Sequence, residues 1–178
     1  MGREPGRGGA SLGVDLIDRS GAMDAARFER LSSQVRSVLA HTGASGEVRI
    51  EIVNDEAMAR AHAEYLDIEG TTDVLTFDLS GGASAEGSPL DVDIMICADE
   101  AQRQADDIGH SVEDEMTLYA VHGVLHCLGF DDTDEASFAR MHAEEDRLLT
   151  AAGLGALFAA ENTARAGGAD QTGEGGER

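Results

Sequence analysis

The chain has 178 residues, a length that suits one domain with its own hydrophobic core. Its 13 basic residues are all arginines and face 35 acidic residues, and the net charge of −22 argues against broad, sequence-independent binding to nucleic acid. We expect neither a membrane span nor a signal peptide, and the two cysteines do not make a disulfide framework, so the expected location is the cytoplasm.

Apolar periodicity and capping residues divide the chain into strands and helices. In chain order, we predict a strand over 12–17, a helix over 24–41, a strand over 47–53, a helix over 54–66, strands over 74–79 and 91–97, and helices over 98–107, 111–128 and 134–151. Four short strands interleaved with five helices predict an α+β or α/β sandwich. We expect the α+β form, a single domain in which a mixed sheet packs against the helices.

The two ends of the chain are rich in glycine and poor in large apolar side chains. We therefore predict disordered tails at residues 1–11 and 161–178 and a folded domain over residues 12–160. Residues 80–89 are expected to form a flexible loop within that domain.

Several helix ends carry recognisable signals. Asp24, Asn54 and Ser111 are predicted N-caps, and Asp114 takes the capping-box position after Ser111. On the last helix, the apolar residues expected to face inward are Phe138, Met141, Leu148 and Leu149.

Two histidines, His122 and His126, lie four residues apart on the predicted helix 111–128. Side chains at this spacing lie on one face, one turn apart, so the pair can bind one divalent metal ion. Gly129 is expected to end the helix, and the chain then turns back with Asp131 and Asp132. Two imidazoles and one carboxylate leave a fourth position open, as in catalytic zinc sites.

An isolated pair of histidines at this spacing is often coincidental, so other features must support the site. Here the stop glycine, the carboxylate pair and the apolar residues around the histidines all favour it. Zinc peptidases with an HExxH helix carry a general-base Glu after the first His, where this chain has Gly123. A metallopeptidase is therefore a disfavoured alternative.

Motifs spread along residues 12–150 resemble those of a known family. Its helix motif, H-G-x-L-H-x-x-G-Y-D-H, is matched at His122, Gly123, Leu125, His126, Gly129 and Asp131. Residues 72–77 (TDVLTF), 90–96 (LDVDIMI) and 111–115 (SVEDE) are similar to its T-D-V-L-S-F segment, its L-G-D-I-V-I strand and the start of its metal helix. The chain thus resembles the YbeY family of metal-dependent endoribonucleases, which act in ribosomal RNA maturation and ribosome quality control.

The resemblance implies an enzyme with a zincin-like metal helix that cleaves single-stranded RNA. It implies one Zn²⁺ per chain, with ribosomal RNA and ribosomal subunit or assembly proteins as partners, and neither DNA nor membrane. The implied metal ligands are His122, His126 and Asp132, and the candidate catalytic residues are His62 and Asp131. Asp73 and Asp93 are expected either to accept hydrogen bonds from the metal-binding imidazoles or to fix the conformation of their loops.

Two departures from the family pattern affect the predicted chemistry. The third metal ligand of the family is a His, which is Asp132 here, and its Arg after the helix Tyr is Leu66 here. A carboxylate in place of an imidazole lowers the charge of the centre by one unit, which weakens the Lewis acid and favours zinc less strongly over harder ions. Asp131 or Asp134 are alternative ligands.

The absence of the family arginine at Leu66 and the negative net charge suggest an alternative hypothesis, in which the protein is a ribosome-assembly binding protein whose metal is mainly structural. In either reading, RNA affinity requires a local cluster of arginines. The first predicted helix offers Arg27 and Arg30 for this purpose.

Overall fold

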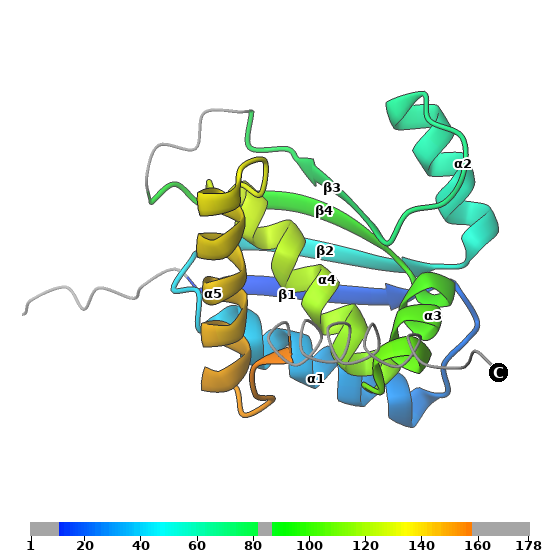
Figure 1. Ribbon diagram of the computed structural model, residues 1–178, viewed down its shortest axis with the longest axis horizontal. Coiled ribbons are helices and arrows are strands. Elements are labelled where there is room, and N and C mark those ends of the chain that lie inside the picture. The colour runs from blue at the N-terminus through cyan, green and yellow to red at the C-terminus, as the bar shows by residue number, and fades with distance from the viewer. Residues whose placement is uncertain (1–10, 82–86, 158–178) are drawn as a thin grey trace, which may run out of the picture.

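The computed structural model describes residues 11–81 and 87–157 (Figure 1). The predicted tails, apart from Ser11, and residues 82–86 of the predicted loop lie outside these ranges. Within them, no helix is long and apolar enough to cross a lipid bilayer.

Four strands form one mixed sheet in the order β1-β2-β4-β3. Their bounds are Leu12–Asp18 for β1, Gly46–Val53 for β2, Val74–Asp78 for β3 and Leu90–Cys97 for β4. The strands β1, β2 and β4 run parallel, whereas β3 pairs with β4 in the antiparallel direction. The predicted mixed sheet is confirmed, and each strand lies within one residue of its predicted limits.

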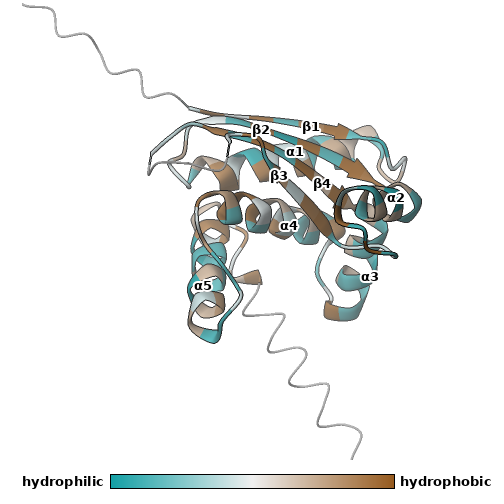
Figure 2. Ribbon diagram, turned by 90° about the horizontal axis from the view of Figure 1, so that it is seen from above, coloured by the Kyte–Doolittle hydropathy of each residue, from teal (hydrophilic) through white to brown (hydrophobic). Residues whose placement is uncertain are grey.

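Five helices accompany the sheet, and α4 lies across it between α1, α3 and α5 (Figure 1). Their bounds are Ala25–Ala40 for α1, Asp55–Leu66 for α2, Ala98–Ile108 for α3, Val112–Cys127 for α4 and Glu135–Ala151 for α5. Figure 2 shows α4 and α5 on the same side of the sheet. This arrangement confirms the predicted α+β domain.

The predicted N-caps are formed. The side chains of Asp24, Asn54 and Ser111 each accept a hydrogen bond from the backbone N–H three residues ahead. Asp114 occupies the capping-box position, from which a carboxylate would accept a hydrogen bond from the backbone of the N-cap residue. Its carboxylate instead accepts a hydrogen bond from the side chain of Gln34 on α1. That hydrogen bond links the start of α4 to α1.

The core lies between the sheet and the two helices α1 and α4. Alternate residues of the central strands, among them Ile50 and Ile94, are at most 3% exposed and belong to the same cluster as Val38 and Val124. Gly123 allows α4 to lie close to the sheet, since a Cβ there would sit 2.5 Å from Thr76 Oγ1 and 3.2 Å from Ile94 Cδ1. This packing explains the glycine at a position where zinc peptidases need a glutamate.

The prediction for one residue of the last helix is wrong. Met141, Leu148 and Leu149 are buried as expected, but Phe138 is 42% exposed. Its ring meets that of His142 edge to face, with the centroids 4.1 Å apart. One turn separates the two residues, so both face the side of α5 that approaches His122 rather than the core.

Candidate metal centre

The end of α4 positions the histidine pair and reverses the chain. His122 and His126 lie one turn apart, and α4 then closes with a Schellman motif. In that motif Gly129 adopts φ +91°, its N–H donates to the carbonyl of His126, and the N–H of Phe130 donates to the carbonyl of Leu125. The predicted stop at Gly129 is confirmed, and it directs the next residues back toward the histidines.

A short turn after Gly129 presents the carboxylate of Asp132. The backbone N–H of Asp132 donates to Asp131 Oδ1 at 2.9 Å, and the Thr133 hydroxyl donates to Asp131 Oδ2 at 2.6 Å. The Thr133 hydrogen bond, followed by those from the backbone, lowers the pKa of Asp131. Both oxygens of Asp131 are thus engaged within the turn, which leaves Asp132 to face the histidines.

Three donor atoms converge at this point. The Nε2 atoms of His122 and His126 are 3.0 Å apart, and Asp132 Oδ2 lies 3.8 and 4.0 Å from them. One point therefore lies about 2.1 Å from all three atoms, which is the length of zinc–nitrogen and zinc–carboxylate bonds. Within the described ranges this is the only such group of histidine, cysteine and acidic side chains that fits a metal ion.

The alternative ligands have other roles in the structure. Asp134 caps α5, where its carboxylate accepts from the backbone of Ala136 and from both the backbone and the hydroxyl of Ser137. The backbone hydrogen bond of Ser137 lowers the pKa of Asp134. Neither Asp131 nor Asp134 belongs to the group formed by the three donor atoms.

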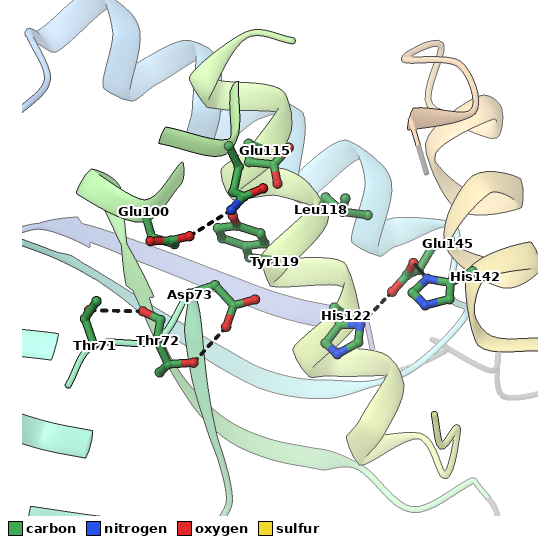
Figure 3. A pocket seen from close by; sticks show the side chains of 11 residues that line it. Thr71, Thr72, Asp73, Glu100, Glu115, Leu118, Tyr119, His122, His142 and Glu145 are labelled. Atoms are coloured by element: carbon green, nitrogen blue, oxygen red, sulfur yellow. Dashed lines mark hydrogen bonds and ion pairs between the residues drawn. The ribbon is translucent and has the colours of Figure 1, made fainter. Parts of the chain in front are cut away.

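A hydrogen bond to a glutamate of α5 orients the ring of His122 (Figure 3). His122 Nδ1 lies 2.8 Å from Glu145 Oε1, and His142 Nδ1 pairs with the other oxygen of the same carboxylate. A carboxylate only accepts hydrogen bonds, so Nδ1 of His122 carries the hydrogen and Nε2 keeps its lone pair for a ligand. Glu145 is 1% exposed, and its position is therefore determined by the packing of α5 on α4.

Opposing influences act on the pKa of His122. Burial is the largest and lowers the pKa, because it disfavours the charged imidazolium. The hydrogen bond and charge of Glu145, together with the charges of Asp132 and Asp73, outweigh it, and the pKa is raised overall. The site is therefore electrostatically favourable for a cation.

The partner of His122 differs from the residues expected from the sequence. Asp93 pairs with Arg49 on the face of the sheet opposite Ile94, away from α4. Asp73 lines the same cavity as His122, and its carboxylate accepts from Val74 N–H and Thr72 Oγ1, which is the loop-fixing role expected as the alternative. Sequence reasoning missed Glu145, although a glutamate four residues after buried Met141, on the apolar face of α5, is a recognisable signal.

Two cavities meet at His122. One, of about 420 Å³, lies between α3, α4 and α5 and is lined by acidic and other polar side chains, including Asp73, Glu100, Glu115, His142 and Glu145 (Figure 3). The other, of about 540 Å³, is mostly apolar and is lined by Tyr65, Leu66, Asp73, Val74, Leu75, Thr76, Phe77, His122 and His126. Such volumes are typical of small-ligand sites.

Other predicted site residues lie apart from the histidines. The ring of His62 on α2 contacts the carbonyl of Gly70 through Nδ1 at 3.0 Å, and His62 lines neither cavity that contains His122. Arg27 and Arg30 both approach Glu113, at the other end of α4 from His126. At a rise of about 1.5 Å per residue, Glu113 and His126 lie about 20 Å apart along α4, so the two arginines are far from the histidines, and their role in RNA binding stays a prediction.

An α+β domain in which two histidines of one helix and a carboxylate of the following turn could hold a metal ion, with a coordination position left over, has the arrangement typical of catalytic metal sites. Comparison with known proteins identifies the family to which the chain belongs. The model of the family described as "Endoribonuclease YbeY" matches residues 17–153. The chain belongs to this family and is therefore an endoribonuclease, a hydrolase of RNA phosphodiester bonds.

Curated relatives match most of the chain. The Endoribonuclease YbeY of Frankia alni is 35% identical to this chain, and the match covers 89% of this chain and 92% of that protein. The Endoribonuclease YbeY of Renibacterium salmoninarum is 38% identical, and the match covers 86% of this chain and 100% of that protein. The Endoribonuclease YbeY of Heliobacterium modesticaldum is 41% identical, and the match covers 61% of this chain and 70% of that protein. The solution structure of TM1509 from Thermotoga maritima covers 93% of this chain at 15% identity and a TM-score of 0.47, and the family assignment does not rest on it.

Proposed function

We propose that this endoribonuclease cleaves single-stranded RNA with the help of one divalent ion, Zn²⁺, held by His122, His126 and Asp132. The convergence of their three donor atoms around a point at bonding distance is the observation that supports the proposal. Three protein ligands leave room in the coordination shell for the substrate. The same residues would also accept a harder divalent ion, because one donor is an oxygen.

The proposed setting is ribosomal RNA maturation and ribosome quality control in the cytoplasm. Family membership supports this setting, with ribosomal RNA as the substrate and ribosomal subunit or assembly proteins as partners. The net charge of −22 supports a selective RNA encounter rather than general attraction to polyanions.

The chain's own residues prepare the site for this chemistry. A bound ion supplies charge stabilisation at the scissile phosphate and lowers the pKa of an attacking water. Glu145 orients His122 through Nδ1, and Asp131 holds the turn that presents Asp132. We include Asp131 as a positioning residue on this ground, whereas the catalytic role of His62 stays a prediction that His62→Ala tests by its cleavage rate.

The test compares single-stranded RNA with duplex RNA and single-stranded DNA of the same sequence, using protein purified without a histidine tag. We expect cleavage of single-stranded RNA alone, its loss with a chelator and its recovery with Zn²⁺. His126→Ala should lose both the copurified ion, measured by elemental analysis, and cleavage. Equal metal content in wild type and His126→Ala contradicts the assigned ligands.

A ribosome-assembly role with a mainly structural metal is the second candidate. Leu66 in place of the family arginine favours it, because no arginine in the described part of the chain lines either cavity at His122. A metal-dependent melting temperature without cleavage under any metal would decide for this candidate.

A further inference from the structure

An exposed aromatic pair lies beside the candidate metal centre. Tyr65, in the last turn of α2, is 57% exposed, and its ring meets that of Phe77 on β3 with the centroids 4.9 Å apart and the planes at 67°. Both rings line the cavity of about 540 Å³ that His122 and His126 also line. A large aromatic ring is thus presented to solvent next to the donor atoms that would hold the metal ion.

The rest of this cavity is suited to a flat, apolar ligand group. Leu66, Val74 and Leu75 contribute to its wall, and Asp73 is the one carboxylate that the described residues place there. The exposed fraction of Leu66 is 53%, so the apolar surface extends beyond Tyr65 at the C-terminal end of α2.

Charge distinguishes the two sides of His122. The polar cavity of about 420 Å³ is lined by four acidic residues, namely Asp73, Glu100, Glu115 and Glu145 (Figure 3). Carboxylates repel a phosphodiester backbone, so a strand that crosses the metal centre is directed to the aromatic side. Among the described residues, no arginine lines either cavity at His122, although Arg49 lines a neighbouring cavity that Tyr65 and Phe77 also line. Within the described ranges, RNA affinity beside the histidines therefore depends on contacts other than arginine side chains.

We propose that Tyr65 and Phe77 form a stacking subsite for the nucleobase next to the scissile phosphate of a single-stranded RNA. The inference deepens the proposed function and rests on it for the identity of the ligand. Stacking on aromatic side chains accepts any base, but only an unpaired base exposes its face. The subsite therefore favours single-stranded over duplex substrate, and it supplies affinity that the missing cations do not.

The probe is a five-nucleotide RNA with one central 2-aminopurine, whose fluorescence is quenched on stacking, and binding is read immediately after mixing, before cleavage. We expect Tyr65→Leu to weaken binding about 5- to 150-fold and to remove the quench. Tyr65→Phe retains the ring and should stay within about twofold of wild type. Because Tyr65 is exposed, both variants should keep the wild-type melting temperature and zinc content.

An abasic nucleotide in place of the 2-aminopurine completes the test. Wild type should lose as much affinity for this RNA as Tyr65→Leu loses for the intact one, and the variant should lose nothing more. Salt should weaken binding only slightly, since no arginine of the described ranges lines the cavity to neutralise a phosphate. Equal affinity of wild type and Tyr65→Leu for the intact RNA would overturn the subsite.

His126→Ala separates this inference from the proposed function. A variant that quenches 2-aminopurine but does not cleave supports the subsite independently of the metal. If wild type cleaves RNA in a metal-dependent way and Tyr65→Leu does so with unchanged affinity and rate, the nuclease function stands and the stacking subsite is wrong.

Discussion

The proposed metal centre takes Asp132 as its third ligand, where the family resemblance implies a third histidine. We expect Asp132→Ala to lose Zn²⁺ affinity nearly as strongly as His126→Ala, because each removes one of three donors. Asp132→His should retain the ion, since it restores a third imidazole. Competition with a chromophoric chelator measures both. Asp134→Ala is the matched control, expected to weaken the N-cap of α5 but to leave metal affinity unchanged. Normal binding by Asp132→Ala would refute the assignment.

Glu145 acts on the metal centre through His122 rather than by touching substrate. Glu145→Gln keeps the size of the side chain but removes its charge and one acceptor oxygen. Groups that orient a metal-binding histidine in this way are typically worth about 10- to 100-fold in metal affinity. We expect a loss of that size in calorimetric titration with Zn²⁺. Glu144→Gln, which only loses a surface pair with Arg147, should bind as wild type does; matching losses in the two variants would exclude a specific role.

At the scale of elements, the contact between α4 and the sheet depends on Gly123. Alanine favours a helix over glycine by about 1 kcal/mol. Here its Cβ would sit 2.5 Å from Thr76 Oγ1, so we expect Gly123→Ala to destabilise the domain by about 1–3 kcal/mol instead. Denaturant unfolding measures the change. Adding Thr76→Ala should recover part of the loss, and equal losses with and without it would show that this contact is not the cause.

A charged contact joins α2 to α3. Arg103 donates to both oxygens of Asp55 at 2.7 and 2.8 Å, and these hydrogen bonds lower the pKa of Asp55 to about 2. Because the folded pKa lies below the unfolded one, the pair stabilises the fold above about pH 4 and ceases to do so as the pH falls toward 2. We expect Arg103→Gln to lower the free energy of unfolding by less than about 1 kcal/mol at pH 7, because the pair is half exposed. A difference of equal size at pH 2 would contradict this account.

At the scale of the whole molecule, the net charge of −22 opposes the compact state. Salt shortens the Debye length from about 30 Å at 0.01 M to about 10 Å at 0.1 M, which screens repulsion between surface carboxylates. We expect the melting temperature to rise over this range in scanning calorimetry. Choline chloride should act as sodium chloride does, which separates screening from cation binding. A constant or falling melting temperature would show that surface ion pairs outweigh the repulsion.

The sequence by itself determined the elements and the histidine pair, because the signals involved span only a few residues. Capping by Asp24, Asn54 and Ser111 depends on an N–H three residues ahead, and the i, i+4 spacing places His122 and His126 on one helical face. The stop at Gly129 is equally local, since it needs only one residue that tolerates a positive φ.

The tertiary structure decided which distant groups complete the site. Glu145 is 23 residues from His122, and their contact depends on how α5 packs on α4, which no local pattern encodes. The same packing left Phe138 partly exposed, and the turn after α4 brought Asp132, rather than Asp131 or Asp134, into the group with both imidazoles. Pairings at long range follow from the burial of whole helix faces, so they become visible only when those faces are in contact.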